Sequence, residues 1–342
     1  MRAGVLALVA VSVAVAGWHV GAASTAERSV PPGAMSVKVV PFRDTTLVYL
    51  DGEIDAGAAD RLARVLDGVD GKIAVWLNSP GGNLYAGMQL GRSIRRHGAS
   101  THIIDSSTLL PGECYSACSL AFLGGVFRFA SNGARYGVHR ASMTAGPDLA
   151  EHLTAAVASY MREMGVDARL LDFWTKAGRD EMYVLTWQET ERLGVVDNGR
   201  KKPVWRFARS PGGSRLEGRQ ATIDGTGTVF FSCDDIRTVF GAVYEDVGAA
   251  ELLAARGGSH WLTITGRDDV PLTATELSRT TFVLAPDLVR LARFATQIGH
   301  RMKPASGGEP SIGCRVDVDA KSASLVRSFL GNCLRRQAKR SS

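Results

Sequence analysis

The sequence predicts an α/β fold for residues 36–198, followed by a smaller α+β region. Short β-branched runs alternate with amphipathic stretches in the first part, which is typical of repeated β-α units around a buried sheet. The chain has 342 residues, which is enough for two domains. With 45% hydrophobic and 22% charged residues, its composition excludes a disordered, collagen-like or disulfide-rich miniature protein.

Two patterns predict the elements of the first region. Apolar, β-branched runs bounded by turn residues predict strands, and apolar residues spaced three and four apart predict helices. Two glycines separate the strand at 73–78 from the helix at 84–96. In chain order, strands are expected at 46–50, 73–78, 100–104, 128–130 and 136–138, and helices at 56–66, 84–96, from or just after 116 to 123, 149–164 and 168–177.

Residues 199–218 are rich in Lys, Arg, Ser, Pro and Gly, which predicts a linker or a long loop. We expect residues 219–342 to form a small accessory α+β domain, and no repeat of solenoid length is visible in it. Its expected strands are 228–232, 260–265 and 315–318, and its expected helices are 288–298 and 323–333. No motif in this region carries recognisable chemistry.

The first 26 residues have the order of a secretory signal. Arg2 precedes an apolar run, Ala3–Gly17, and small residues follow through Ser24. Cleavage is expected after Ala23 or Ala26, and the alternative is an uncleaved membrane anchor. Either interpretation predicts an exported protein that is periplasmic, secreted or membrane-tethered. No later segment reaches the ~20 uninterrupted apolar residues that a membrane span needs.

The charge balance gives no indication of a nucleic-acid partner. Lys and Arg total 40 against 34 Asp and Glu, for a net charge of +6. Part of the excess lies in two short runs, Arg200–Lys202 and the tail 335–340, which we interpret as solvated segments.

Three short segments carry residues suited to a catalytic site. Gly81 and Gly82 end a strand and open a helix, so their N–H groups can approach a ligand, although a tight turn alone would also explain them. Ser116 opens a buried helix, whose positive end favours a developing anion, but serine is also a common N-cap. His139 ends an apolar strand, where a lone histidine is more often structural than a base.

The order of these segments resembles the Clp-type peptidase and crotonase superfamily, most closely the proteolytic subunit of Clp protease and the signal peptide peptidases. The matching residues are 47–54, Asn78-Ser79-Pro80-Gly81-Gly82, Ser116, Phe122-Leu123-Gly124-Gly125, Phe127-Arg128-Phe129-Ala130, Ala134-Arg135 and His139. The interval from serine to histidine is 139 − 116 = 23 residues, close to that of the family. This resemblance covers residues 45–197 and implies a crotonase-type β-β-α superhelix that forms homo-oligomers.

The resemblance also implies the catalytic roles. Ser116 is expected to be the nucleophile and His139 its general base. The backbone N–H groups of Gly82 and Ala117 are expected to form the oxyanion hole.

The third catalytic position departs from the family pattern. Counting back twelve residues from Gly194 gives Met182, so Asp180 serves only with a two-residue insertion. A backbone carbonyl or another side chain can orient the histidine instead. Lys176 is an alternative base, since some signal peptide peptidases use lysine.

A second departure concerns assembly. His139 and Asp180 are 180 − 139 = 41 residues apart, somewhat fewer than in the family, so a sealed chamber and an ATPase partner are not expected. The predicted substrate is a peptide or an unfolded protein.

The cysteines suit an oxidising compartment. There are five, so at least one is free or bridges to another molecule. Cys114 and Cys118 flank Ser116 at a spacing that allows a disulfide locking the turn, or they are two small buried residues. Catalysis by either cysteine is a further alternative.

No metal or cofactor is expected. His97 and His102 lack neighbouring ligands, and the pairs Asp234-Asp235 and Asp268-Asp269 are typical of turns. The sequence therefore predicts an exported serine hydrolase, a peptidase. The alternatives are a catalytically inactive scaffold or binding protein of the same fold and an acyl-CoA enzyme of the same superfamily.

Overall fold

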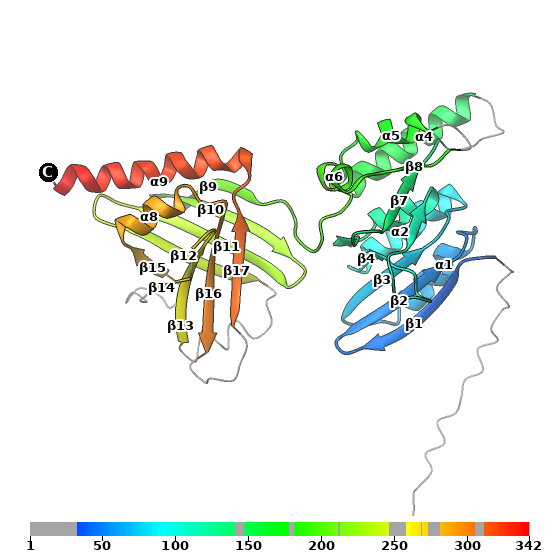
Figure 1. Ribbon diagram of the computed structural model, residues 1–342, viewed down its shortest axis with the longest axis horizontal. Helices are drawn as coiled ribbons and strands as arrows, with labels where there is room; N and C mark the ends of the chain where they lie inside the picture. Colours follow the sequence, from blue (N-terminus) through cyan, green and yellow to red (C-terminus); the bar gives the residue numbers. More distant parts are fainter. Residues whose placement is uncertain are drawn as a thin grey trace, which may run out of the picture. The chain divides into compact units, whose positions relative to one another are not determined.

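The computed structural model is a mixed α/β structure with several sheets (Figure 1). It describes residues 33–140, 147–177, 181–210, 213–245, 258–267, 269–272, 281–304 and 311–341. The predicted signal segment, residues 1–26, lies outside the described residues. Among the described helices, none combines the length and the apolar character that a membrane crossing requires.

The first hydrophobic core surrounds a five-stranded sheet of order β1-β2-β3-β4-β6. Its strands are β1 (Ser36–Phe42), β2 (Thr45–Asp51), β3 (Lys72–Asn78), β4 (Ser100–Ile103) and β6 (Arg128–Phe129). β1 pairs antiparallel with β2, and the other neighbours are parallel. Alternation buries Val48 and Leu50 of β2 beside Val75 and Leu77 of β3, because successive side chains point to opposite faces.

The helices of the first core contribute apolar stripes. Ala58, Leu62 and Leu66 are buried at intervals of four residues on α1. The Asn83 side chain accepts a hydrogen bond from the N–H of Ala86 and fixes the start of α2. These helices are α1 (Ala58–Leu66), α2 (Leu84–Arg96), α3 (Ala117–Leu123), α4 (Pro147–Glu163), α5 (Leu170–Lys176) and α6 (Trp187–Arg192).

A small sheet completes the first core. Its order is β5-β7-β8, comprising β5 (Glu113–Tyr115), β7 (Arg135–Val138) and β8 (Tyr183–Val184). β5 runs parallel to β7, and β8 runs antiparallel to it. The carboxyl ends of β5 and β7 therefore lie side by side, and each leads directly into a residue singled out from the sequence.

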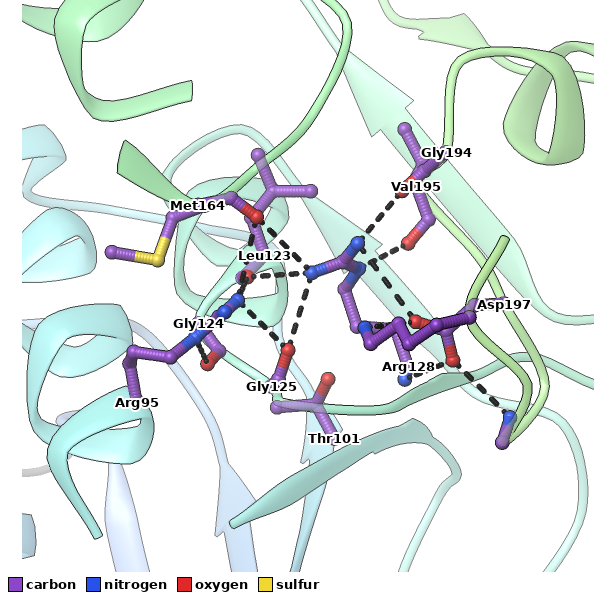
Figure 2. Close-up of polar contacts among 12 residues, drawn as sticks. Arg95, Thr101, Leu123, Gly124, Gly125, Arg128, Met164, Gly194, Val195 and Asp197 are labelled. Atoms are coloured by element: carbon purple, nitrogen blue, oxygen red, sulfur yellow. Dashed lines mark hydrogen bonds and ion pairs between the residues drawn. The ribbon is translucent and has the colours of Figure 1, made fainter. Parts of the chain in front are cut away.

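Two arginines, Arg95 and Arg128, bind helix ends of this core (Figure 2). The guanidinium group of Arg128 is 4% exposed and donates to the carbonyls of Val195 and Gly194 at 2.8 Å. Arg95 donates through Nε to the carbonyl of Gly124 at 2.8 Å. Both arginines donate to the carbonyls of Leu123 and Gly125. This arginine cluster thus satisfies carbonyl groups at the end of α3 and in the segment that follows α6.

A second hydrophobic core lies between two antiparallel sheets. The first sheet, β15-β12-β11-β10-β9, contains β9 (Val204–Ser210), β10 (Gly213–Thr222), β11 (Gly225–Cys233), β12 (Thr238–Glu245) and β15 (Thr281–Leu284). The second, β14-β13-β16-β17, contains β13 (Gly258–Ile264), β14 (Val270–Leu272), β16 (Gln297–Pro304) and β17 (Ile312–Asp317). Two helices, α8 (Pro286–Ala292) and α9 (Ala320–Ser341), pack in this region.

Most of the expected elements are confirmed within two residues in the first region. The linker at 199–218 is wrong, because residues 204–210 and 213–222 form the antiparallel strands β9 and β10. Gly218 is part of the reason: a Cβ there would lie 2.6 Å from the Trp205 ring, so this glycine makes room for a core side chain. The helix at 288–298 is also wrong in its second half, where Ile298 begins the buried alternation of β16.

Replacing Arg128 with methionine is expected to destabilise the protein. The substitution keeps the apolar stem but leaves several buried carbonyls without donors, which lowers the free energy of unfolding by about 3–5 kcal/mol. Urea denaturation followed by tryptophan fluorescence measures this change. R169M is the control, because Arg169 is an exposed residue paired with Asp167. Equal urea midpoints for R128M and R169M would contradict the structural role of Arg128.

His102 is expected to make the protein less stable at acid pH. Burial lowers the pKa of His102 to about 4, whereas an unfolded histidine has a pKa of about 6.5. Below pH 6.5 the unfolded chain binds a proton that the folded chain does not, so stability is complete above 6.5 and falls by about 3 kcal/mol towards pH 4. Urea midpoints between these pH values should decline less steeply in H102Q, and an unchanged slope would argue against burial of a neutral imidazole.

Candidate active site

Ser116 lies on a sharp turn between β5 and α3. We call Tyr115–Ala117 the serine turn. Ser116 has φ 54° and ψ −120°, a conformation that costs a residue other than glycine roughly 1–3 kcal/mol. A strained turn from strand to helix exposes a nucleophilic side chain at the start of the helix.

Neighbouring backbone groups fix the serine turn on both sides. The N–H of Ser116 donates to the carbonyl of Gly137 in β7 at 3.0 Å, and the N–H of Tyr115 donates to the carbonyl of Ser79 at 3.1 Å. The hydroxyl of Ser119 donates to the carbonyl of Ser116 at 2.6 Å. The strained conformation is therefore set by three different segments of the chain.

The structure brings the side chains of Ser116 and His139 together. The distance from Ser116 Oγ to His139 Nε2 is 2.8 Å, and His139 directly follows β7. Ser116 occupies the N-cap position of α3, but its side chain makes no capping hydrogen bond to the helix. In the tautomer with its proton on Nδ1, the imidazole accepts the serine proton at Nε2.

The first glycine of the pair Gly81-Gly82 lies against the serine. Gly81 and Gly82 have φ of 105° and 133°, and a Cβ on Gly81 would lie 2.7 Å from Ser116 Cβ. The carbonyl of Gly81 accepts from the N–H of Ile54 at 2.7 Å. Within the described part of the chain, the N–H groups of Gly82 and Ala117 have no hydrogen-bond acceptor. Both groups can therefore donate to a ligand, as an oxyanion hole requires.

The third predicted catalytic residue has no described counterpart beside His139. Asp180 lies outside them, and no carboxylate among residues that the structure describes hydrogen-bonds to His139. Met182 packs against Gly137, since a Cβ on that glycine would lie 2.8 Å from the Met182 side chain. Lys176, the alternative base, instead places its ammonium group 3.9 Å from the centre of the Phe173 ring.

Polar and charged groups on β5 adjoin the serine turn. Burial raises the pKa of the Tyr115 hydroxyl, and the charge of Glu113 adds to the shift. Arg135 forms an ion pair with Glu113 at 3.1 Å, and its guanidinium carbon lies 5.6 Å from the centre of the Tyr115 ring. An exposed ion pair therefore lies beside the aromatic ring of the serine turn.

The cysteines flanking Ser116 form a disulfide. Cys114 and Cys118 are fully buried, with their Cα atoms 5.1 Å apart. A disulfide excludes either cysteine as a nucleophile, because neither has a free thiolate. A second disulfide joins Cys233 to Cys333, and Cys314 is free.

Several contacts that fix the serine turn are not visible in the sequence, although Ser79 belongs to the motif that ends at Gly82. Ser79 and Gly137 act through backbone carbonyls, and Ser119 acts through a hydroxyl that resembles any other helix serine in the sequence. Within the described ranges, no group of three or more metal-ligating side chains is present. Asp234 accepts hydrogen bonds from the N–H groups of Ile236 and Arg237, as its interpretation as a turn residue predicts.

Comparisons with known proteins give no sequence match and a distant structural similarity. No protein-family model matches the chain, and no curated protein matches it. Among solved structures, it is similar to a mutant of the 1510-N membrane-bound stomatin-specific protease, with 20% sequence identity and a TM-score of 0.35. The match covers 44% of this chain and 75% of that chain. The class of protein that the fold and the site define is a mixed α/β protein in which a serine and a histidine are hydrogen-bonded to each other.

Gly81→Ala is expected to disrupt the serine turn. A Cβ at this position would lie 2.7 Å from both Ser116 Cβ and the Tyr115 carbonyl, in addition to straining the positive φ. Gly98→Ala is the matched control, because its φ is also positive but nothing lies within 4 Å. We expect G98A to lower the free energy of unfolding by about 1–2 kcal/mol and G81A by a further 1–3 kcal/mol. Equal losses in urea denaturation would show that the close contact is absent.

Proposed function

We propose that this protein is a serine hydrolase, specifically a peptidase, in which Ser116 is the nucleophile and His139 the general base. The observation that carries the proposal is the 2.8 Å hydrogen bond between Ser116 Oγ and His139 Nε2. The strained backbone of Ser116 supports it, because such conformations persist where surrounding structure imposes them and cluster at active sites.

The proposed reaction is acyl transfer in two stages. His139 takes the hydroxyl proton as Ser116 Oγ attacks the substrate carbonyl, and it then gives that proton to the leaving amine. Water activated by His139 hydrolyses the resulting acyl-enzyme. The N–H groups of Gly82 and Ala117 stabilise the tetrahedral oxyanion, and each such donor is worth about 3–4 kcal/mol in known cases.

Asp180 is our candidate for the group that orients His139. β8 pairs antiparallel with β7, so Tyr183 lies opposite Val138, and the chain just before β8 leads past the end of β7. Asp180 precedes β8 by three residues. A carboxylate at the second ring nitrogen would hold the tautomer that accepts the serine proton.

The proposal extends to fold family, location and substrate. The motif order supports a Clp-type or crotonase-type superhelix in residues 36–198, with an accessory domain after it and homo-oligomers as the working form. The signal-like pattern of residues 1–26 and the two disulfides support a periplasmic or secreted protein. An exported hydrolase meets no ATP-driven unfoldase, so its substrates are peptides or unfolded proteins.

A catalytically inactive scaffold of the same fold is the second candidate function. One observation favours it: no described carboxylate reaches His139. It differs from the hydrolase in a single measurable property, the reactivity of the Ser116 hydroxyl.

Labelling with a fluorophosphonate probe tests the hydrolase. This electrophile forms a covalent bond with activated serines, so the wild-type protein should be labelled at Ser116. S116A should lose all labelling, and H139A should lose at least about 100-fold of the labelling rate because the general base is absent.

S131A is the matched control, since Ser131 is an exposed serine shortly after β6 in the same region of the chain. Its labelling should equal that of the wild type. Absence of labelling in the folded wild type would favour the scaffold, and labelling that persists in S116A would remove Ser116 from its role.

A further inference from the structure

The disulfide between Cys114 and Cys118 brackets the serine turn. Cys114 is the central residue of β5, and Cys118 is the second residue of α3, so each lies two positions from Ser116. The two Cα atoms are 5.1 Å apart, whereas four extended residues span about 13 Å. The cross-link therefore excludes every extended arrangement of the segment that carries the nucleophile.

The elements on either side of the serine turn cannot impose its conformation alone. β5 has three residues and α3 has seven, and a helix this short is not stable by itself in water. Ser116 does not cap α3, because its hydroxyl is directed to His139. The non-covalent contacts that hold the serine turn are the backbone hydrogen bonds of Ser116 to Gly137 and Ser119, the bond from Tyr115 to Ser79 and the side-chain bond to His139. None of them is covalent, so each can open when the turn moves.

We propose that the Cys114–Cys118 disulfide is a positioning cross-link that makes the hydrolase active only in its oxidised form. The inference rests on the proposed function, because the cross-link acts through Ser116. Without it, the backbone of Ser116 relaxes from its positive φ, and Oγ moves out of hydrogen-bonding distance of Nε2 of His139. The enzyme is therefore inactive in a reducing compartment, where Cys114 and Cys118 are thiols, and becomes active after export, when the disulfide forms.

The redox step is an ordinary thiol–disulfide exchange. The two cysteine thiols lose two protons and two electrons to an external disulfide, which is reduced to two thiols. A dithiol or a phosphine reverses the step by supplying two electrons. Cys114 and Cys118 are fully buried, so reduction requires a local opening of the serine turn.

The second disulfide provides a matched control. Cys233 and Cys333 are 100 residues apart and join β11 to α9 in the second core, away in sequence from the serine turn. The remaining cysteine, Cys314, is free, and burial raises the pKa of its thiol to about 12, which lowers the fraction of reactive thiolate. The two disulfides therefore differ in whether they constrain Ser116.

The test compares C114A/C118A, C233A/C333A and the wild type, all oxidised and full length. Fluorophosphonate labelling at several probe concentrations separates the first-order inactivation constant from probe affinity. We expect C114A/C118A to lose at least about tenfold in the inactivation constant with probe affinity within about threefold, since misplacement of a reacting group by an ångström costs this much or more. C233A/C333A should keep the wild-type constant within about twofold, even where its thermal stability falls.

Each outcome has a distinct meaning. A folded C114A/C118A variant with the wild-type inactivation constant overturns the positioning role while leaving the proposed function intact. An oxidised, folded wild type that is not labelled overturns the proposed function and this inference with it.

Should C114A/C118A fail to fold, as judged by circular dichroism, the wild type is titrated with a phosphine reductant instead. Mass spectrometry of alkylated cysteines then follows the opening of each disulfide. Labelling should fall in step with reduction of Cys114–Cys118 and return on reoxidation. Full labelling of a protein whose Cys114–Cys118 disulfide is completely reduced overturns the proposal.

Discussion

The positive φ of Ser116 is the constraint on which the candidate site depends. An L-amino acid adopts this backbone conformation only where its surroundings determine it. Here the surroundings are the carbonyl of Gly137, the absent side chain of Gly81 and the disulfide on either side. The conformation directs Oγ to His139 instead of to the first turn of α3, as the proposed role of Ser116 as nucleophile requires.

The two ends of α3 differ in how their polar groups are hydrogen-bonded. At its first turn, the N–H of Ala117 is left without an acceptor in the described part of the chain, which makes it available to a ligand. At its last turn, Arg95 and Arg128 bind the carbonyls of Leu123, Gly124 and Gly125 (Figure 2). Because α3 is too short to be stable alone, the arginine cluster supplies stability at one end while the other end keeps its polar groups free.

The sequence predicts the parts of this arrangement that depend on local pattern. The strand alternation of Val75 and Leu77, the glycines at 81 and 82 and the spacing of Ser116 and His139 are visible without coordinates. The carbonyl partners of Arg128 cannot be predicted from the sequence. Every residue has a backbone carbonyl, so the identities of Gly194 and Val195 do not show that they accept these hydrogen bonds. The pairing of β9 with β10 is not predictable for a related reason: the charged residues of this segment are typical of a linker, whereas the contact of Gly218 with Trp205 depends on the folded structure.

The residue that would make the serine turn most stable differs from the residue that an acyl-transfer reaction needs at position 116. This difference helps to distinguish an enzyme from a scaffold. A scaffold would gain stability from glycine at this position, which removes the strain of a positive φ, or from a hydroxyl that caps α3. The chain instead has a strained serine, a helix start without a side-chain cap and two N–H groups without described acceptors, all within the serine turn and Gly82. Departures from the usual backbone and capping preferences that cluster at one position are expected at a functional site. Together with the hydrogen bond to His139, these features are what an acyl-transfer site needs: a nucleophile that does not cap the helix, a base in contact with it and donors for the oxyanion. This coincidence favours the hydrolase over the scaffold on physical grounds.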